Sequence, residues 1–257
     1  MNFSDAVPAE PAVPRAAATV LLLRDGAGGL EVFLQRRVAG MAFAAGMTVF
    51  PGGGVDQRDA DATIAWAGPS AADWAGWFNA TEQVARALVC AAVRETFEES
   101  GVLLAGTADT ADTVVTRTDQ YAGARDELVS RDVSLAGFLA REGLTLRSDL
   151  LRPWAHWITP VQEKRRYDTR FFAAKLPQGQ DADGKTTEAE SSGWFRPGDA
   201  LADAAAGRST LMPPTWHTLT ELAEFGSADE ALAAERVIEA IIPKLIRDGD
   251  EIRVVAE

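Results

Sequence analysis

The sequence predicts a mixed α/β domain, and three observations lead to this fold class. Two apolar, β-rich runs at 17–25 and 30–37 are separated by the segment GAGG, which is typical of a β-hairpin. A helical pattern covers 81–100, between Thr81 as the N-cap and Gly101 as the terminating glycine. Strand patterns return at 154–160 and 166–177, after one or two helices within 119–142.

The remaining segments complete one predicted domain. The stretch 45–56 reads as a short strand that ends in a glycine-rich turn, and 57–80 reads as an inserted loop with short helical pieces. Residues 181–193 form a polar loop, and 212–225 and 227–242 carry helical patterns. We therefore expect a flexible leader at 1–15 and a single domain at 16–257. This domain has an insertion at about 57–80 and a helical part at about 199–257.

Composition and charge exclude several classes of protein. The chain has 257 residues and a net charge of −13, so it is not expected to bind nucleic acid, whose phosphates repel an acidic surface. A single cysteine, Cys90, excludes an internal disulfide and a cysteine-based zinc site. No apolar run is long enough to span a membrane, and the N-terminus lacks the basic start and apolar core of a signal peptide. A cytoplasmic location is therefore expected.

Three carboxylates lie on one face of the predicted helix 81–100. Glu95, Glu98 and Glu99 are spaced i, i+3 and i+4, so their like charges repel. They also crowd the helix C-terminus, where the macrodipole disfavours anions. A bound divalent cation would reverse both effects, because Mg²⁺ and Mn²⁺ take oxygen ligands. The alternative is a solvated acidic helix end, and the spacing alone leaves both interpretations open.

The residues around these glutamates resemble a known motif. The segment RETFEESGV at 94–102 is similar to the helical half of the Nudix box, with Thr96 at a position that is usually apolar, and FPGGGVD at 50–56 is similar to its glycine turn. The chain therefore resembles the Nudix hydrolases, which cleave nucleoside diphosphates linked to another group. The resemblance covers about 16–200. It implies a Nudix-type α/β/α sandwich with a mixed sheet and extra helices in the insertion and at the C-terminus.

The resemblance also implies roles for individual residues. Glu98 and Glu99 would be ligands of Mg²⁺ or Mn²⁺, and Glu95 would be a further ligand or hold a metal-bound water. Arg94 would pair with a glutamate of the helix and keep it oriented. The glycines 52–54 would let the loop approach the helix, with Gly53 offering backbone groups to metal and phosphate.

The chain departs from the Nudix box in two places. The box has a glutamate eight residues before its arginine, a position that Arg86 occupies here, and about 27 residues separate Gly54 from Glu82. The long gap resembles a Nudix branch with an insertion inside the box, which includes coenzyme A diphosphatases. GMTVFPGG at 46–53 and FLQRR at 33–37 are similar to parts of the motif of those enzymes, although Ala42 replaces its intervening arginine.

Two further groups of residues are candidates for the site. Nudix enzymes often take an additional acid from a loop before a strand, and either Glu188 or Glu190 in TTEAESSGWF would be the general base, with Glu163 as a further candidate. A solvated loop is the alternative interpretation of these acids. The basic residues expected to contact substrate phosphates are Arg36, Arg37, Arg166 and Arg170, together with Lys164 and Arg165. Charged strand ends of this kind are also common on ordinary surfaces.

The expected substrate is a small nucleoside diphosphate derivative. Coenzyme A or an acyl-CoA is one candidate, and ADP-ribose, NADH or a dinucleoside polyphosphate is the alternative. A catalytically silent Nudix-fold binding protein is the rival class, although it would need a damaged metal site. The sequence predicts neither a nucleic-acid nor a membrane partner and leaves a homodimer open.

Overall fold

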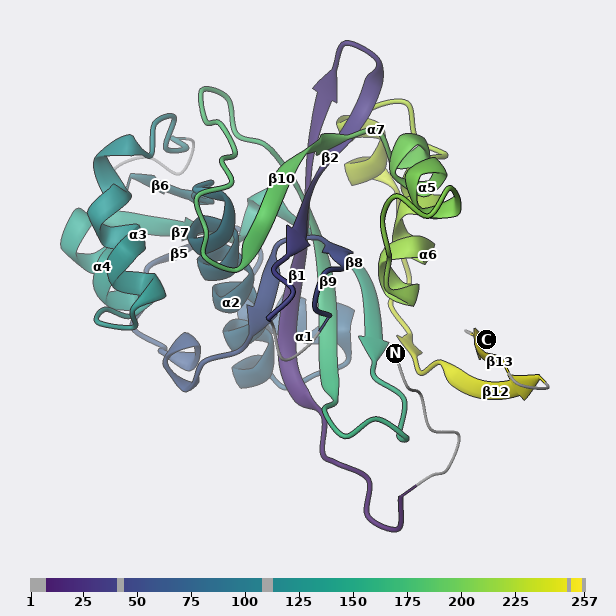
Figure 1. Ribbon diagram of the computed structural model, residues 1–257. Helices are drawn as coiled ribbons and strands as arrows, with labels where there is room; N and C mark the ends of the chain where they lie inside the picture. Colours follow the sequence, from purple (N-terminus) through teal and green to yellow (C-terminus); the bar gives the residue numbers. More distant parts are fainter. Residues whose placement is uncertain (1–7, 41–43, 108–112, 249–250, 256–257) are drawn as a thin grey trace.

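A mixed β-sheet lies between two layers of helices, as the computed structural model shows for residues 8–40, 44–107, 113–248 and 251–255 (Figure 1). Strands of this sheet follow the order β10-β2-β1-β9-β8-β11, while β3 pairs with β2 and β4 pairs with β1. The pairs β1–β9 and β8–β11 are parallel, and the other pairs are antiparallel. The predicted fold class is therefore confirmed.

The elements have the following bounds. The strands are β1 (Arg15–Gly26), β2 (Gly29–Arg37), β3 (Thr48–Val49), β4 (Gly52–Gly54), β5 (Trp66–Ala67), β6 (Ala105–Thr107), β7 (Leu144–Arg147), β8 (Leu151–Ile158), β9 (Tyr167–Lys175), β10 (Ala189–Phe195), β11 (Ala240–Ile241), β12 (Lys244–Asp248) and β13 (Glu251–Val255). The α-helices are α1 (Ala71–Phe78), α2 (Glu82–Ser100), α3 (Ala122–Val129), α4 (Leu135–Glu142), α5 (Pro197–Ala205), α6 (Pro213–Leu222) and α7 (Ala228–Ala233). Short 3₁₀ turns are η1 (Gln57–Ala60), η2 (Asp119–Tyr121) and η3 (Ser148–Leu150).

Alternation along the central strands divides the core between the two helical layers. In β1, Val20 and Leu22 point to the side of α1–α4, whereas Leu21 and Leu23 point to the side of α5–α7. A second small sheet, β5-β7-β6, lies beside α3 and α4 (Figure 1). This two-sided burial explains why β1 reads as a continuous apolar run rather than an alternating one.

Helix α2 forms as the sequence predicts. Thr81 accepts a hydrogen bond from the backbone of Val84, and Gly101 ends the helix in the left-handed conformation. Buried Thr96 satisfies its hydroxyl by donating to the carbonyl of Ala92, which explains how a polar residue occupies an apolar position of the motif.

The insertion at 57–80 is more than a peripheral loop. Its helix α1 packs on α2, and Trp74 and Phe78 are fully buried in the same core as Phe172 of β9. The ring of Trp74 lies 5.3 Å from that of Phe172. The helical pieces are expected, whereas the sequence leaves the burial of this segment open, because its aromatic residues follow no strong helical period.

The predicted helical C-terminal part is wrong beyond α7. Ala234 has an extended backbone, and the following residues include strand β11, which pairs with β8 at the edge of the main sheet. Arg236 stacks over the ring of Trp154 at 3.4 Å and pairs with Glu221. Edge pairing and this stacking therefore override the helical propensity of an alanine- and glutamate-rich segment.

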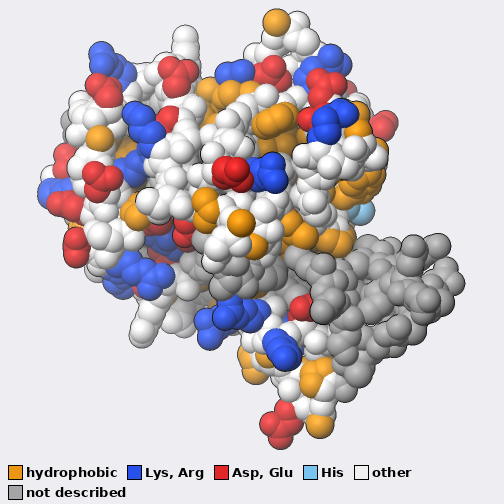
Figure 2. Space-filling model, viewed as in Figure 1, with side chains coloured by type: hydrophobic (Ala, Val, Ile, Leu, Met, Phe, Trp, Pro, Cys, Tyr) orange, Lys and Arg blue, Asp and Glu red, His pale blue; other side chains and the backbone are white. Residues whose placement is uncertain are grey.

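Within the expected leader, Arg166 of the main body donates to the carbonyl of Ala12 at 2.8 Å, and residues 1–7 lie outside the described part. Acidic and basic side chains are interspersed on the face that Figure 2 shows. In the described ranges, every helix is too short or too polar to cross a membrane.

We expect the insertion to behave as core in a stability measurement. Trp74→Ala should lower the free energy of unfolding by about 3–5 kcal/mol, because it removes a fully buried ring and leaves a cavity. Trp77→Ala is the matched control, since Trp77 is 42% exposed and a partly exposed site should lose less. Denaturant unfolding measures both values. Equal and small losses of unfolding free energy in the two variants would indicate that this segment is a peripheral loop.

Candidate active site

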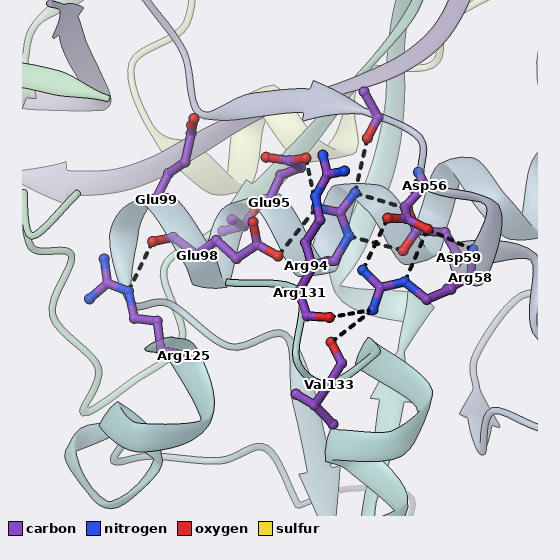
Figure 3. Close-up of polar contacts among 12 residues, drawn as sticks. Asp56, Arg58, Asp59, Arg94, Glu95, Glu98, Glu99, Arg125, Arg131 and Val133 are labelled. Atoms are coloured by element: carbon purple, nitrogen blue, oxygen red, sulfur yellow. Dashed lines mark hydrogen bonds and ion pairs between the residues drawn. The ribbon is translucent and has the colours of Figure 1, made fainter. Parts of the chain in front are cut away.

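Arg94 is the hub of a buried polar network (Figure 3). Its guanidinium donates to both carboxylate oxygens of Asp59, from Nε to Oδ1 at 3.0 Å and from Nη2 to Oδ2 at 2.9 Å. Nη2 also donates to the carbonyl of Gly54, and Nη1 donates to Glu95 at 2.7 Å and Glu98 at 3.2 Å. One side chain thus joins the glycine turn, η1 and two acids of α2.

Asp59 belongs to the candidate site, and the sequence analysis does not single it out. We had assigned Arg86 to the position of the missing box acid, but Arg86 lies over the ring of Trp66 at 5.4 Å. The acid opposite the arginine is Asp59, which is 3% exposed and precedes the rest of the insertion. The sequence feature that identifies Asp59 is its position shortly after the glycine turn. The fixed spacing of the box, counted back from Arg94, does not reach it because the insertion lies between them.

Glu99 faces the glycine turn rather than Arg94. It accepts hydrogen bonds from the backbone N–H of Gly52 at 2.8 Å and from the side chain of Gln35 on β2. Gly53 lies against Glu95, and a Cβ at Gly53 would come within 2.5 Å of that carboxylate. The turn therefore needs glycine at this position because the acid occupies the space of a side chain.

Burial and mutual repulsion shift the pKa values of these acids upward. Desolvation raises the pKa of Glu95 to about 7, with a further rise from the charge of Glu98 and opposition from Arg94. Desolvation and the charge of Glu95 raise the pKa of Glu99 to about 8. Desolvation also raises the pKa of Glu98, while Arg94 and Arg131 oppose the rise. The site disfavours full ionisation of its carboxylates unless a cation joins them.

The donor set fits a hard divalent cation by its chemistry. Carboxylate oxygens are the ligands that Mg²⁺ and Mn²⁺ take, and closely placed buried acids are relieved by such a charge. Within the described ranges, no three acidic, histidine or cysteine side chains are gathered as a ready-made metal cluster. The reason is visible in the contacts, since Glu95 and Glu98 turn to Arg94 while Glu99 turns to Gly52.

A cavity of about 970 Å³ opens beside Glu95 and extends between the sheet and α6, while Glu98 and Glu99 do not line it. Its polar lining includes Arg15, Arg37, Gly52, Gly53, Gly54, Arg94, Glu95, Arg131, Glu163 and Glu188. Its apolar lining includes Val49, Phe50, Trp157, Phe171, Leu211 and Met212. The cavity therefore has a charged region at the glycine turn and α2, and an apolar wall formed by the sheet and the chain entering α6.

The two loop acids have different positions. Glu188 lines the cavity and pairs with Arg37 at 2.8 Å. Glu190 pairs with Arg36 at 3.7 Å. Both side chains are at least half exposed, and neither residue lines the cavity. Residues two apart on a strand normally share a face, but a register shift between Ala189 and Ser191 breaks that relation.

The remaining predicted basic residues lie elsewhere. Arg166 donates to the carbonyls of Thr159 and Ala12. Arg170 is buried and pairs with Asp168, while its neighbours on β9 face the cavity, so alternation places it on the opposite side of the sheet. Lys164 and Arg165 do not line the cavity, and Ala42 lies outside the described residues. Arg15 and Arg131 are lining cations that the sequence analysis did not single out.

This fold and site together define a Nudix hydrolase, an enzyme class that acts on pyrophosphate bonds. The family described as the NUDT19 Nudix domain matches residues 80–222, and the chain belongs to it. The crystal structure of a NUDIX hydrolase from Alicyclobacillus acidocaldarius has a TM-score of 0.75 and 28% identity, covering 88% of this chain and 98% of that one. The predicted family and the predicted enzyme class are confirmed.

Two named relatives are similar over most of the chain. A putative nudix hydrolase 7 from Caenorhabditis elegans is 28% identical and covers 91% of this chain, which spans 68% of that relative. The acyl-coenzyme A diphosphatase NUDT19 from Xenopus laevis is 26% identical and covers 78% of this chain, which spans 61% of that relative.

The raised pKa values predict how stability depends on pH in the metal-free protein. Folded Glu99 keeps its proton up to about pH 8, whereas the unfolded chain releases it near the model value of 4.5. The free energy of unfolding should therefore fall as the pH rises through this window. Glu99→Gln removes the titration and preserves a hydrogen-bond acceptor, so it should stabilise the protein at pH 9 by about 2 kcal/mol or more and change little at pH 4. Denaturant unfolding at both pH values in a chelator measures this difference, and a Gln variant that is less stable at pH 9 would contradict it.

Proposed function

We propose that this chain hydrolyses the diphosphate of coenzyme A or an acyl-CoA with Mg²⁺ or Mn²⁺ as cofactor. The observation that carries the proposal is the cavity, which at about 970 Å³ joins Glu95 and the glycine turn to a long apolar wall. This volume lies near the upper end of the range for small-molecule sites. Coenzyme A is a long ligand with a charged nucleotide end and a less polar pantetheine arm. The name of the frog relative and the similarity of GMTVFPGG to the coenzyme A motif support the same substrate.

The proposed reaction is hydrolysis at one phosphorus of the diphosphate. The oxygen of water forms a new P–O bond, the bridging P–O bond breaks, and the products are 3′,5′-ADP and a 4′-phosphopantetheine compound. The proton of water passes to a general base, and the bridging oxygen leaves as part of a phosphate anion. Stabilising the charge on the phosphoryl oxygens is the main demand of this chemistry.

Each residue of the site has a proposed part in this reaction. Glu95, Glu98 and Glu99 would hold the cation, with Gly53 supplying backbone groups, and the bound cation would neutralise phosphoryl charge. Arg94 keeps Glu95 and Glu98 oriented. Its guanidinium nitrogens donate to four protein partners, so no N–H group remains to donate to a ligand. It is a positioning residue.

A panel of nucleoside diphosphate derivatives tests the substrate. We expect coenzyme A and an acyl-CoA to be cleaved with a higher kcat/KM than ADP-ribose, NADH or a dinucleoside polyphosphate, and only with Mg²⁺ or Mn²⁺ present. Adding either metal should also raise the Tm of the folded protein by mass action. The double variant Glu98→Gln/Glu99→Gln should lose this Tm shift.

Two outcomes would count against these assignments. Higher turnover of ADP-ribose or a dinucleotide than of coenzyme A would move the substrate to that class. An undiminished Tm shift in the double glutamine variant would place the metal elsewhere in the chain.

The position of Glu188 predicts which loop acid serves as the general base. Glu188→Gln should lower kcat by about 10²–10⁴, the range that general base catalysis contributes. Glu190→Gln removes the same charge two residues away and should retain most of the activity, since Glu190 points away from the cavity lining. Steady-state kinetics with saturating Mg²⁺ measures both. Equal losses of kcat would indicate that the total charge of the loop affects the rate and that neither acid acts alone as the base. A loss of kcat confined to Glu190→Gln would assign the general base to Glu190.

A further inference from the structure

Helix α3 ends in an unusual way at the edge of the cavity. Arg131 follows the helix with a φ of 64°, in the left-handed region. Its backbone N–H donates to the carbonyl of Leu128, and the N–H of Asp132 donates to that of Glu127. This pair of bonds is a Schellman motif, whose left-handed position is usually glycine, sometimes asparagine.

Other described helices that end in this conformation use the expected residues. Asn79 follows α1, Gly101 follows α2 and Gly143 follows α4. Left-handed backbone costs conformational energy for a residue with a Cβ atom, and Arg131 adopts it nonetheless. Strain of this kind persists where a side chain is needed at that place.

The loop that carries Arg131 is held from the glycine-turn side of the site. Nη1 of Arg58 donates to the carbonyl of Arg131 at 3.0 Å and to that of Val133 at 3.5 Å. Arg58 is itself fixed by Asp56, which it contacts through Nε and Nη2, both at 3.1 Å (Figure 3). The backbone of Arg131 is therefore fastened to the segment that leads out of the glycine turn.

The guanidinium of Arg131 is the available cation next to the acids. Its side chain lines the cavity, and its charge is close enough to Glu98 to oppose the rise in the pKa of that acid. Arg94 and Arg58 are engaged by protein acceptors, and Arg37 pairs with Glu188. Among the described residues, Arg131 has no hydrogen-bond or ion-pair partner for its guanidinium.

We propose that Arg131 binds the diphosphate of the substrate. The inference rests on the proposed function, because it assumes that the diphosphate lies beside Glu95 and Glu98. A guanidinium presents a planar set of donors that matches two phosphate oxygens, and it keeps its charge at every relevant pH.

Arg131→Asn and Arg131→Gly test this assignment without damaging the fold. Both replacements suit the left-handed backbone, so the Tm should stay the same or rise. The affinity for inorganic pyrophosphate, measured by calorimetry with and without Mg²⁺, should fall about tenfold or more. The kcat/KM should fall by a similar factor for coenzyme A, dephospho-coenzyme A and ADP-ribose alike, because all of them contain the diphosphate.

Two matched variants serve as controls. Arg117→Asn removes the same charge from an exposed arginine that pairs only with Asp119 among the described residues and does not line the cavity, so it should leave both readouts unchanged. Arg131→Lys keeps the charge but loses the planar donors, and it should fall between the wild type and Arg131→Asn.

Several results would overturn the proposal. Pyrophosphate affinity of Arg131→Asn within about twofold of the wild type would do so, as would a wild type that binds no pyrophosphate. A loss that appears with coenzyme A but not with dephospho-coenzyme A would assign Arg131 to the 3′-phosphate instead. A loss on Arg15→Asn alone would place the diphosphate at the other cation of the cavity. If the wild type binds pyrophosphate through Arg131 but cleaves no coenzyme A, the proposed substrate fails and the role of Arg131 stands.

Discussion

A single buried guanidinium holds the catalytic region of this protein together. A charge removed from water is stable only when every donor finds a partner, and Arg94 meets this requirement with Asp59, Gly54, Glu95 and Glu98. Because these partners come from three segments, the glycine turn, the start of the insertion and the acidic face of α2 have fixed relative positions. The direction in which the chain leaves Asp59 then places α1 against α2, where Trp74 completes the core.

The distribution of charge bears on the polyanionic substrate that we propose for this strongly acidic chain. The net charge of −13 opposes phosphate binding over most of the surface, whereas in the cavity lining Arg15, Arg37, Arg94 and Arg131 balance the four acids Asp56, Glu95, Glu163 and Glu188. Cavities with low-dielectric walls concentrate the field of the charges that line them. Burial desolvates Glu95 and Glu99 and raises their pKa values, an effect that the proposed cation would offset.

Local sequence patterns are sufficient to predict the parts of the fold that depend on interactions between residues close together in the chain. Helix α2, its two caps and the shared face of its glutamates follow from spacing within twenty residues. The burial of Trp74 was not predictable in this way, since it depends on Phe172 of a strand almost a hundred residues later. A bulge in β10 lies between Glu188, which lines the cavity, and Glu190, which does not. Bulges leave little trace in a sequence. Alternation along β9 shows that Arg170 and its neighbours point to opposite faces of the sheet. It does not show which of the two faces meets the cavity.

The contacts of α2 also determine when the site comes into existence during folding. Arg94 and Asp59 are separated by 35 positions, Glu99 and Gly52 by 47, and Glu99 and Gln35 by 64. A helix forms from local bonds within microseconds, whereas contacts at such separations require the intervening chain to be closed into loops first. The helix that carries the acids can therefore form before any of them has its partner. The arrangement of the acids is therefore a product of long-range contacts and not of the helix alone.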